Sequence, residues 1–367
     1  MDKFLSRDDT KVMKAIAIIL MLAHHLWILP ERIAGGSLRY VFQIFGQSSI
    51  VYLGWFGKIC VSLFFFLGGY GIYISSYGKK YDVISKLKGL YFSYWKVFVI
   101  FIPMGFLFFR NQPAYCENHG IYARFENFSV AEFLANITGI DISYTSEWWF
   151  LTSYVFAILS FPVIRGMVEK HSARRNILSV IIASIVVTNV LPAIGNIEAI
   201  GSLNNNYLYA KLFCQSSPYI ASFWMGAVVA ENGLLDRLNE SLEKNHLLNP
   251  CMDIIIWAIC IYFRQTGIGD SFDIIYIPFL IVTSKDLLER VPHIRKIFLH
   301  IGKESTNMWL IHPFFCYYFY PFVKIVVAPR WALPSLFILI VMSYLASVMV
   351  DYIWKGILYI PKRIKKC

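Results

Sequence analysis

The sequence predicts an all-α, polytopic membrane helix bundle of about ten transmembrane helices, with both termini in the cytoplasm. Three observations predict this class. The 367 residues are 57% hydrophobic and only 16% charged, whereas soluble domains carry about 25% charged residues. Apolar runs recur from residue 12 to residue 357 and leave little room for a soluble domain. Lysine and arginine also gather in alternate connecting loops, as in other multi-pass membrane proteins.

The apolar runs set the expected spans. The seventh and eighth are shorter than the roughly 20 residues that a bilayer requires. Either these two spans are tilted, or Arg264 and Lys285 extend them by snorkelling to the membrane surface. The ten expected spans cover residues 12–29, 59–76, 91–109, 147–165, 176–194, 212–230, 251–264, 272–285, 306–327 and 332–357.

The distribution of basic residues predicts the orientation. With a cytoplasmic N-terminus, 24 of the 34 Lys and Arg residues lie on the cytoplasmic side, nine lie on the opposite side, and Lys96 lies inside a span. This bias follows the positive-inside rule, and an even number of spans maintains it. The net charge of +11 is therefore explained by topology, and no nucleic-acid partner is predicted. We expect a multi-pass protein of the plasma membrane, in contact with membrane lipid.

Other sequence features narrow the class further. The seven cysteines include no Cys-x-x-Cys pair, so neither a disulfide framework nor a metal site is predicted. The first apolar run has no cleavage site and is expected to remain as a helix. The longest external segments are 30–58 and 110–146, and the second contains an amphipathic stretch at 128–140. Interfacial belts are the expected location of Trp27, Trp55, Trp95, Trp148, Trp149, Trp331 and Trp354.

The first span carries ionisable residues that are costly inside a membrane. Lys14 and His25 are 11 positions apart; at about 100° per residue they share one helix face, about 16 Å apart along the axis. This geometry suits a long donor with an anionic head and a reactive tip, such as a coenzyme A thioester. A buried imidazole could then take a proton from an attacking hydroxyl. Alternatively, Lys14 snorkels and the histidines bond to neighbouring helices; the spacing alone favours this second interpretation.

Four motifs extend along nearly the whole chain. The first is Lys14-x10-His25, and the second is Val61–Tyr70 with its Gly68-Gly69 pair. The third is Glu147-Trp-Trp-Phe-Leu151 followed by Ser160-Phe-Pro162. The fourth is Ile301–His312, with a Gly-Lys-x-Ser turn that leads towards a histidine. In order and spacing they resemble the bacterial integral-membrane acyltransferase family 3, as a single domain over residues 1–367 with a core of about 11–357.

The resemblance implies about ten transmembrane helices and transfer of an acyl group, most often acetyl, from acyl-CoA. The implied acceptor is an extracytoplasmic surface polysaccharide or its lipid-linked precursor. Acetyl-CoA is then a co-substrate, and no cofactor is bound permanently. The resemblance assigns general-base catalysis to His25 and the donor's phosphates to Lys14. Lys14 replaces the family's more usual Arg and loses its bidentate fork.

Further positions are candidates with structural alternatives. Lys86 and Lys88 are similar to a basic family stretch before an aromatic helix, although Gly89 departs from it, and both could simply set topology. Lys96 requires a phosphate, carboxylate or carbonyl partner, and Asp351 is expected to pair with a nearby base or to cap an internal hydrogen-bond network. Ser305 has the character of a helix N-cap. Six further residues are candidates for contacting the donor, contacting the acceptor or supporting His25. They are His24, Tyr70, Glu147, Trp149, Ser305 and His312.

Two other classes of protein remain as alternatives. A transporter or flippase for a sugar or an anion would explain ten spans and lysines within the membrane. It would predict discontinuous helices and internal pseudo-symmetry, but the sequence shows no internal repeat, and the four motifs would go unexplained. An inactive family member acting in polysaccharide export would retain the fold without the chemistry. The sequence does not specify the acceptor sugar, the acyl chain, a covalent intermediate or the oligomeric state.

Overall fold

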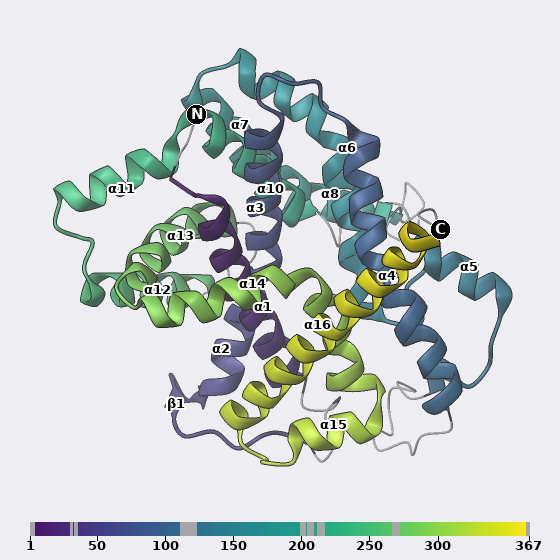
Figure 1. The fold of residues 1–367 in the computed structure, drawn as a ribbon. Helices are drawn as coiled ribbons and strands as arrows, with labels where there is room; N and C mark the ends of the chain where they lie inside the picture. Colours follow the sequence, from purple (N-terminus) through teal and green to yellow (C-terminus); the bar gives the residue numbers. More distant parts are fainter. Residues whose placement is uncertain are drawn as a thin grey trace. The chain divides into compact units, whose positions relative to one another are not determined.

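The computed structural model describes residues 4–29, 32, 36–110, 123–198, 203, 209–210, 217–265 and 272–364. The chain divides into two compact units that are interleaved in sequence. The first unit comprises residues 1–17, 58–86 and 150–302, and the second comprises residues 18–57, 87–149 and 303–367. Helices α1, α4 and α14 contribute residues to both units (Figure 1). The single domain expected from the sequence stays a prediction.

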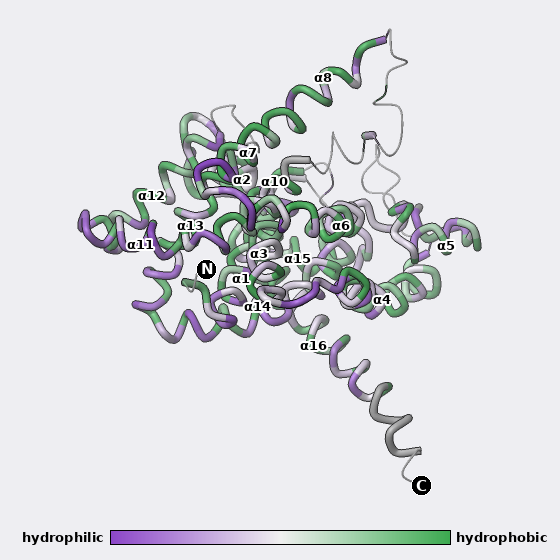
Figure 2. The backbone as a smooth tube through the Cα atoms, turned by 90° about the horizontal axis from the view of Figure 1, so that it is seen from above, coloured by the Kyte–Doolittle hydropathy of each residue, from purple (hydrophilic) through white to green (hydrophobic). Residues whose placement is uncertain are grey.

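The described residues form helices of the length and composition that a membrane requires. Six of them qualify as spans, and a seventh qualifies if one bent pair is counted together. Ten spans and cytoplasmic termini therefore stay predictions. In Figure 2 most of α7 (Ala173–Ile185) and α8 (Leu191–Gly195) is hydrophobic, whereas α11 (Leu234–Lys244) is largely hydrophilic. The six spans are Arg7–Trp27, Ser49–Ser76, Val83–Phe108, Ser146–Lys170, Ala173–Gly195 and Ala332–Ile357.

One predicted loop is too long. Residues 30–58 were expected to be external, but α2 (Ser49–Gly57) precedes α3 (Ile59–Ser76), and together they form the candidate span Ser49–Ser76. A two-stranded antiparallel hairpin, β1 (Gln43–Ile44) and β2 (Gln47–Ser48), precedes α2. The charge of Lys58 interrupts the apolar pattern, and the predicted span was therefore started at residue 59. A single lysine does not end a helical segment, so the candidate span begins earlier.

In the first unit, α3 packs along α10 (Ser217–Asn232), and the two ribbons run side by side (Figure 1). Glycines make this close approach possible. A Cβ atom on Gly69 would lie 1.8 Å from the carbonyl oxygen of Phe223, and one on Gly226 would lie 2.1 Å from that of Phe66. Small residues at such crossings allow backbones to approach within a membrane. The Gly68-Gly69 motif is thus explained by helix packing.

The other helices of the first unit are α6 (Trp149–Lys170), α12 (Pro250–Phe263) and α13 (Asp273–Glu289). Snorkelling was one of the two expectations for Arg264, and it was wrong. Its side chain is 5% exposed, and its Nε donates to Asp273 Oδ1 at 2.8 Å. The Ser62 hydroxyl donates to the other oxygen of Asp273 at 2.6 Å. A buried pair of this kind removes the need for the guanidinium to reach water. Lys285 forms an ion pair with Glu289 at 2.7 Å on the same helix.

In the second unit, α4 (Val83–Phe108) is connected to a short helix of the segment 110–146. The amphipathic stretch 128–140 of that segment contains this helix, α5 (Val130–Thr138). Ser129 caps its N-terminus by accepting from the backbone N–H of Glu132, and Gly139 follows its last residue with φ of 74°. The Tyr94 hydroxyl donates to the Asn136 carbonyl oxygen at 2.7 Å and connects α4 to α5.

Trp148 was expected in an interfacial belt, and this was wrong. It is fully buried, and its Nε1 donates to the Leu310 carbonyl oxygen at 3.0 Å. Its ring packs against Tyr94 and Phe314, at centroid distances of 5.0 and 5.8 Å. An indole can occupy a core when its N–H finds a partner. The hydropathy pattern of the neighbouring span cannot distinguish this arrangement from a belt.

The predicted span 306–327 is not one straight helix. Helix α14 (Pro292–Pro313) continues into a π-helical segment, η10 (Phe314–Tyr318), and then the chain bends by 89° into α15 (Tyr320–Val327). Phe319 at the bend has an extended backbone. Pro313 removes one backbone donor, and Pro321 lies in the first turn of α15, where its missing N–H breaks no helical hydrogen bond. The last helix, α16 (Ala332–Ile364), follows α15.

The crossing of α3 and α10 predicts that Gly69→Ala destabilises the protein. The added methyl group overlaps the backbone of Phe223, and we expect a cost of about 1–3 kcal/mol or more. The midpoint of thermal unfolding in detergent should fall by several degrees. Gly71→Ala, two residues away, meets nothing within 4 Å and should leave the midpoint unchanged or slightly raised. Equal midpoints for both variants would contradict the packing argument.

Candidate functional site

The second unit holds two adjacent histidines near the end of α1 (Arg7–Trp27). His24 Nδ1 lies 2.9 Å from the Gly54 carbonyl oxygen of α2. A carbonyl oxygen only accepts hydrogen bonds, so Nδ1 of His24 carries the proton. The His24 and His25 rings meet edge to face, with centroids 5.3 Å apart. His24 therefore has a packing contact with α2 and lies beside His25.

His25 also contacts the histidine of the fourth motif. The centroids of the His25 and His312 rings are 5.0 Å apart, at an angle of 42°. His312 is fully buried, and its Nδ1 donates to the Trp309 carbonyl oxygen at 2.7 Å. This bond places the proton of a neutral His312 on Nδ1 and leaves a lone pair on Nε2. Two residues far apart in sequence thus form one imidazole pair.

Two nitrogens of the pair are distinctive. Nδ1 of His25 and Nε2 of His312 are buried, and neither has a hydrogen-bond partner within the described part of the chain. Most buried polar atoms in proteins have such a partner, and each exception requires an explanation. A group that binds transiently between or beside the rings is one explanation. The pair therefore has the open hydrogen-bonding capacity of a site that handles protons.

Tyrosines of η10 connect His25 to a buried ion pair. The Tyr317 hydroxyl donates to the backbone carbonyl of His25 at 2.5 Å, and the guanidinium of Arg32 lies 3.9 Å from the Tyr317 ring centroid. Arg32 donates to Glu147 Oε1 at 2.7 Å. The arginine therefore holds the ring through a cation–π contact and the carboxylate through an ion pair.

Glu147 accepts hydrogen bonds from three side chains. Besides Arg32, the Ser146 hydroxyl donates to Oε1 at 3.2 Å, and the Tyr318 hydroxyl donates to Oε2. The Glu147 side chain is only 3% exposed. A carboxylate without water requires such donors to remain ionised. Burial lowers the pKa of the Arg32 guanidinium, but Tyr317 and Glu147 outweigh this effect and raise the pKa above its ordinary value. Both groups are therefore charged.

Comparison with known proteins gives this site a context. A family model described as an acyltransferase domain matches residues 9–351. The chain belongs to acyltransferase family 3. No curated protein and no solved structure matched the chain. Family membership makes the protein an O-acyltransferase, and together with its long apolar helices it indicates a membrane protein. The transporter interpretation does not explain this match.

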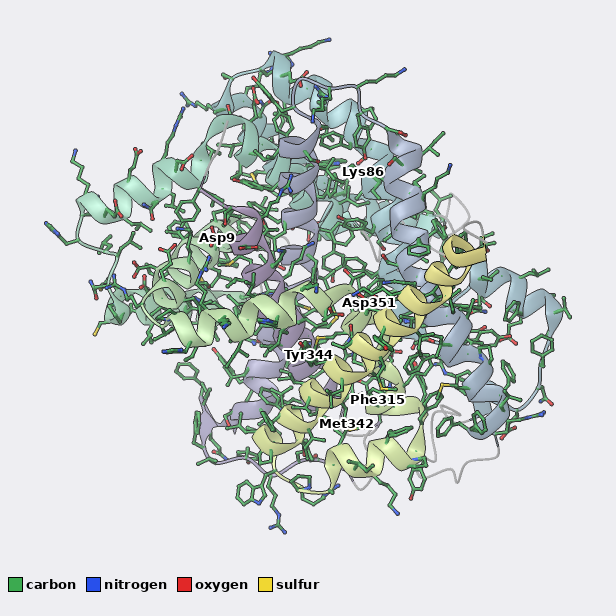
Figure 3. All side chains as sticks on the ribbon, viewed as in Figure 1. Asp9, Lys86, Phe315, Met342, Tyr344 and Asp351 are labelled. Atoms are coloured by element: carbon green, nitrogen blue, oxygen red, sulfur yellow. The ribbon has the colours of Figure 1, made fainter. Side chains whose placement is uncertain are left out.

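In this acyltransferase, the candidate donor residues are divided between the units. Lys14 is half-buried on α1 and belongs to the first unit, whereas His25 belongs to the second. Helix α1 is continuous between them, which preserves their separation of about 16 Å along the axis. Lys86 lies at the start of α4, where its Nζ is 3.4 Å from the Ser75 hydroxyl, and Lys88 is exposed (Figure 3 labels Lys86).

The remaining candidates of the acyltransferase have mainly structural surroundings. Ser305 was expected at a helix N-terminus, and this was wrong, because α14 runs unbroken from Pro292 to Pro313 and buries Ser305 in its interior. Gly302 of the same motif contacts α1: a Cβ atom there would lie 1.7 Å from the Lys11 carbonyl oxygen. Tyr70 is buried on α3 in the first unit, and Trp149 is half-buried at the start of α6.

Sequence patterns did not indicate Arg32, Ser146, Tyr317 or Tyr318. Arg32 was counted only as an external basic residue, and the two tyrosines lie in an aromatic run that is typical of a membrane span. The sequence offered one indication of the two tyrosines: they follow the motif residue His312 by five and six positions, and are therefore close to it in the chain. No group of three or more His, Cys, Asp or Glu suited to a metal ion occurs among the residues whose positions are described.

Lys96 has the carboxylate partner that its position requires. Its Nζ lies 2.5 Å from Asp351 Oδ1, which also accepts from Asn307 Nδ2 at 2.9 Å. Asp351 lies on α16 (Figure 3), so the expected pairing of Asp351 with a base is confirmed. The Trp354 indole of the same helix donates to the Lys96 carbonyl oxygen at 3.1 Å. These bonds connect α4, α14 and α16 and give Lys96 a structural role.

This ion pair predicts that Lys96→Met destabilises the protein, because Asp351 is left as a largely buried charge without its cation. We expect a loss of about 2 kcal/mol or more and a fall of several degrees in the unfolding midpoint. Adding Asp351→Asn should recover part of the loss, because the second charge is removed. A double variant that unfolds no later than Lys96→Met would show that the two side chains are not coupled.

Proposed function

We propose that this acyltransferase moves an acyl group, acetyl in the main case, from acyl-CoA to a hydroxyl of an extracytoplasmic polysaccharide or lipid-linked sugar. The observation that carries the proposal is the His25–His312 pair. Its two buried nitrogens without partners among the described residues provide the proton-accepting capacity that ester formation requires. The family match supplies the class of reaction, and the pair supplies a location for it.

The proposed chemistry is direct transfer with His25 as general base. The acceptor O–H bond breaks as its proton passes to the His25 imidazole, and the oxygen attacks the thioester carbonyl carbon. The new C–O ester bond forms and the C–S bond breaks. The imidazolium then returns the proton to the departing thiolate, so that free CoA and the acylated acceptor leave. An imidazole suits this exchange because the ordinary pKa of a histidine side chain lies near neutral pH, so the ring can both accept and return a proton.

His312 has a complementary role in this proposal. Because its Nδ1–H donates to the Trp309 carbonyl, a neutral His312 presents Nε2 as an acceptor. That nitrogen can hold the reacting hydroxyl or the protonated His25 by a hydrogen bond. His24 is held by Gly54 and acts as a packing neighbour. The ion pair of Arg32 and Glu147 holds Tyr317 and thereby the backbone of His25.

For the donor, we assign the cytoplasmic phosphates of CoA to Lys14, with Lys86 and Lys88 as further basic residues. A thioester extended along α1 would join Lys14 to His25, since about 16 Å separates them. This direction requires the N-terminus of α1 to face the cytoplasm of a plasma-membrane protein, as the basic loops predict. Lys96 is set aside from donor binding because Asp351 neutralises it.

A His25→Ala variant should lose acyl transfer by at least about 100-fold, because the general base is absent. Inside-out membrane vesicles supplied with acetyl-labelled acetyl-CoA allow two measurements: label in the glycan fraction and release of the CoA thiol. His24→Asn retains a nitrogen that can donate to Gly54 and should remain active. Full labelling by a folded His25→Ala protein would remove the proposed base, and an inactive wild type would favour the alternative of a non-catalytic member.

His312 permits a sharper substitution. The side-chain amide of His312→Asn can still donate to the Trp309 carbonyl, but it lacks an atom at the position of Nε2. We therefore expect an unchanged unfolding midpoint and at least a tenfold loss of acyl transfer, about 1.4 kcal/mol in the barrier. A variant with wild-type turnover would show that Nε2 takes no part, whereas a variant with a lowered midpoint would show that the histidine serves the fold.

A further inference from the structure

A polar cavity of about 570 Å³ lies in the second unit, next to the residues already described. Its volume falls within the range of about 300–1,000 Å³ that is usual for small-molecule sites. Its walls come from η2 (Ala123–Phe125), from the start of α5, and from the segment that follows α5. The lining residues are Arg124, Asn127, Glu132, Asp141, Ile142, Ser143 and Ser146.

The cavity wall is held by a hydrogen-bond network centred on Ser143. Arg124 donates to the Ser143 carbonyl oxygen at 2.6 Å, and the Ser143 hydroxyl donates to Glu132 Oε1 at 2.5 Å. The buried Asn136 donates to the same hydroxyl at 2.9 Å and accepts from the backbone N–H of Tyr144 at 3.2 Å. The polar side chains of the wall are thereby positioned before any ligand binds, which reduces the entropic cost of binding.

Two residues of the lining contact the residues around Glu147. Ser146 lines it, and the hydroxyl of Ser146 lies 3.2 Å from the Tyr318 hydroxyl and donates to Glu147. Arg124 also lines it, with its guanidinium 4.9 Å from the Tyr318 ring centroid. A ligand in the cavity would therefore contact the side chains that surround Glu147. Glu147 in turn holds Arg32 and, through it, Tyr317 and His25.

The charges of the lining determine which ligand it can accept. Glu132 and Asp141 are two carboxylates, whereas Arg124 is the one cation among the described lining residues and is engaged by the Ser143 carbonyl and the Tyr318 ring. Each carboxylate uses one oxygen in a local bond, Glu132 with Ser143 and Asp141 with the N–H of Ile142. Carboxylates accept strong hydrogen bonds from hydroxyl groups and repel other carboxylates.

We propose that this cavity is the acceptor subsite and that it selects a neutral, hydroxyl-rich sugar unit over an acidic one. The inference rests on the proposed function, since it names the substrate class of the same site. Glu132 and Asp141 accept hydrogen bonds from sugar hydroxyls, and Asn127 and Ser143 supply further polar contacts. Ser146 marks the end of the cavity from which a hydroxyl passes towards the imidazole pair.

The test compares two trisaccharides of equal length, the neutral maltotriose and the acidic trigalacturonate. Purified full-length protein in nanodiscs is given labelled acetyl-CoA, and acceptor labelling is followed with saturation-transfer NMR of each sugar. The informative variant is Asp141→Lys, with Glu126→Gln as the control, because Glu126 lies in the same segment but outside the cavity lining. We expect maltotriose to bind and to be labelled in preference, and Asp141→Lys to raise its KM at least about tenfold.

The fall in kcat of Asp141→Lys should be smaller than the rise in KM, and its relative preference should shift towards trigalacturonate. Preferred labelling of trigalacturonate by the wild type, or equal KM values for wild type and Asp141→Lys, would overturn the acceptor subsite. Thiol release without any labelling of maltotriose would also overturn it. Maltotriose binding that depends on Asp141 without any thiol release would instead contradict the proposed function and leave the sugar site intact.

Discussion

The ion pair between Arg32 and Glu147 is the interaction on which the candidate site depends. A carboxylate that is removed from water must be surrounded by donors or lose its charge. Arg32, Ser146 and Tyr318 meet this requirement. They bring together the chain after α1, the start of the α6 span and the π-helical segment η10. Arg32, which neutralises the buried Glu147, also packs on the ring of Tyr317, and Tyr317 in turn donates to the backbone of His25. The position of His25 therefore depends on the neutralisation of Glu147.

Three other pairs of oppositely charged side chains follow the same rule. Arg264 is paired with Asp273, Lys96 with Asp351, and Asp9 with Arg295 at 2.6 Å. Such pairs bind helices together where hydrophobic attraction between helices is weak. Nδ1 of His25 and Nε2 of His312, which have no partner in the part of the chain that the structure describes, differ from them, because a neutral ring can be buried without a counter-charge. The charged pairs therefore serve the fold, whereas the two imidazole nitrogens remain able to bind a substrate group.

The sequence predicted features that depend on local pattern. Long apolar runs located six candidate spans, and the spacing of Lys14 and His25 placed both on one continuous helix. The bend at Phe319 was not predicted, because a π-helical segment and a following proline leave the hydropathy pattern unbroken. Ser305 was misassigned because a Gly-Lys-x-Ser sequence resembles a helix start, although the glycine is required for packing against Lys11.

The contacts of the site could not be predicted for a related reason. Arg32 and Glu147 are separated by 115 positions, and Glu147 and Tyr318 by 171. Hydropathy carries no information about which polar side chains will meet across such distances. Motif resemblance identified His25, Glu147 and His312 as candidates, whereas the residues that connect them, Arg32 and the two tyrosines, are brought to the site only by the tertiary fold.

The π-helical segment sets a limit on how this chain can vary in length. Phe314–Tyr318 lies between His312 and the bend at Phe319, and it presents one tyrosine to His25 and the next to Glu147. Deleting one residue there would remove the wider π-helical turn, rotate all that follows about the helix axis and turn both hydroxyls away from their acceptors. Evolution can therefore exchange side chains in this stretch more easily than it can shorten or lengthen it.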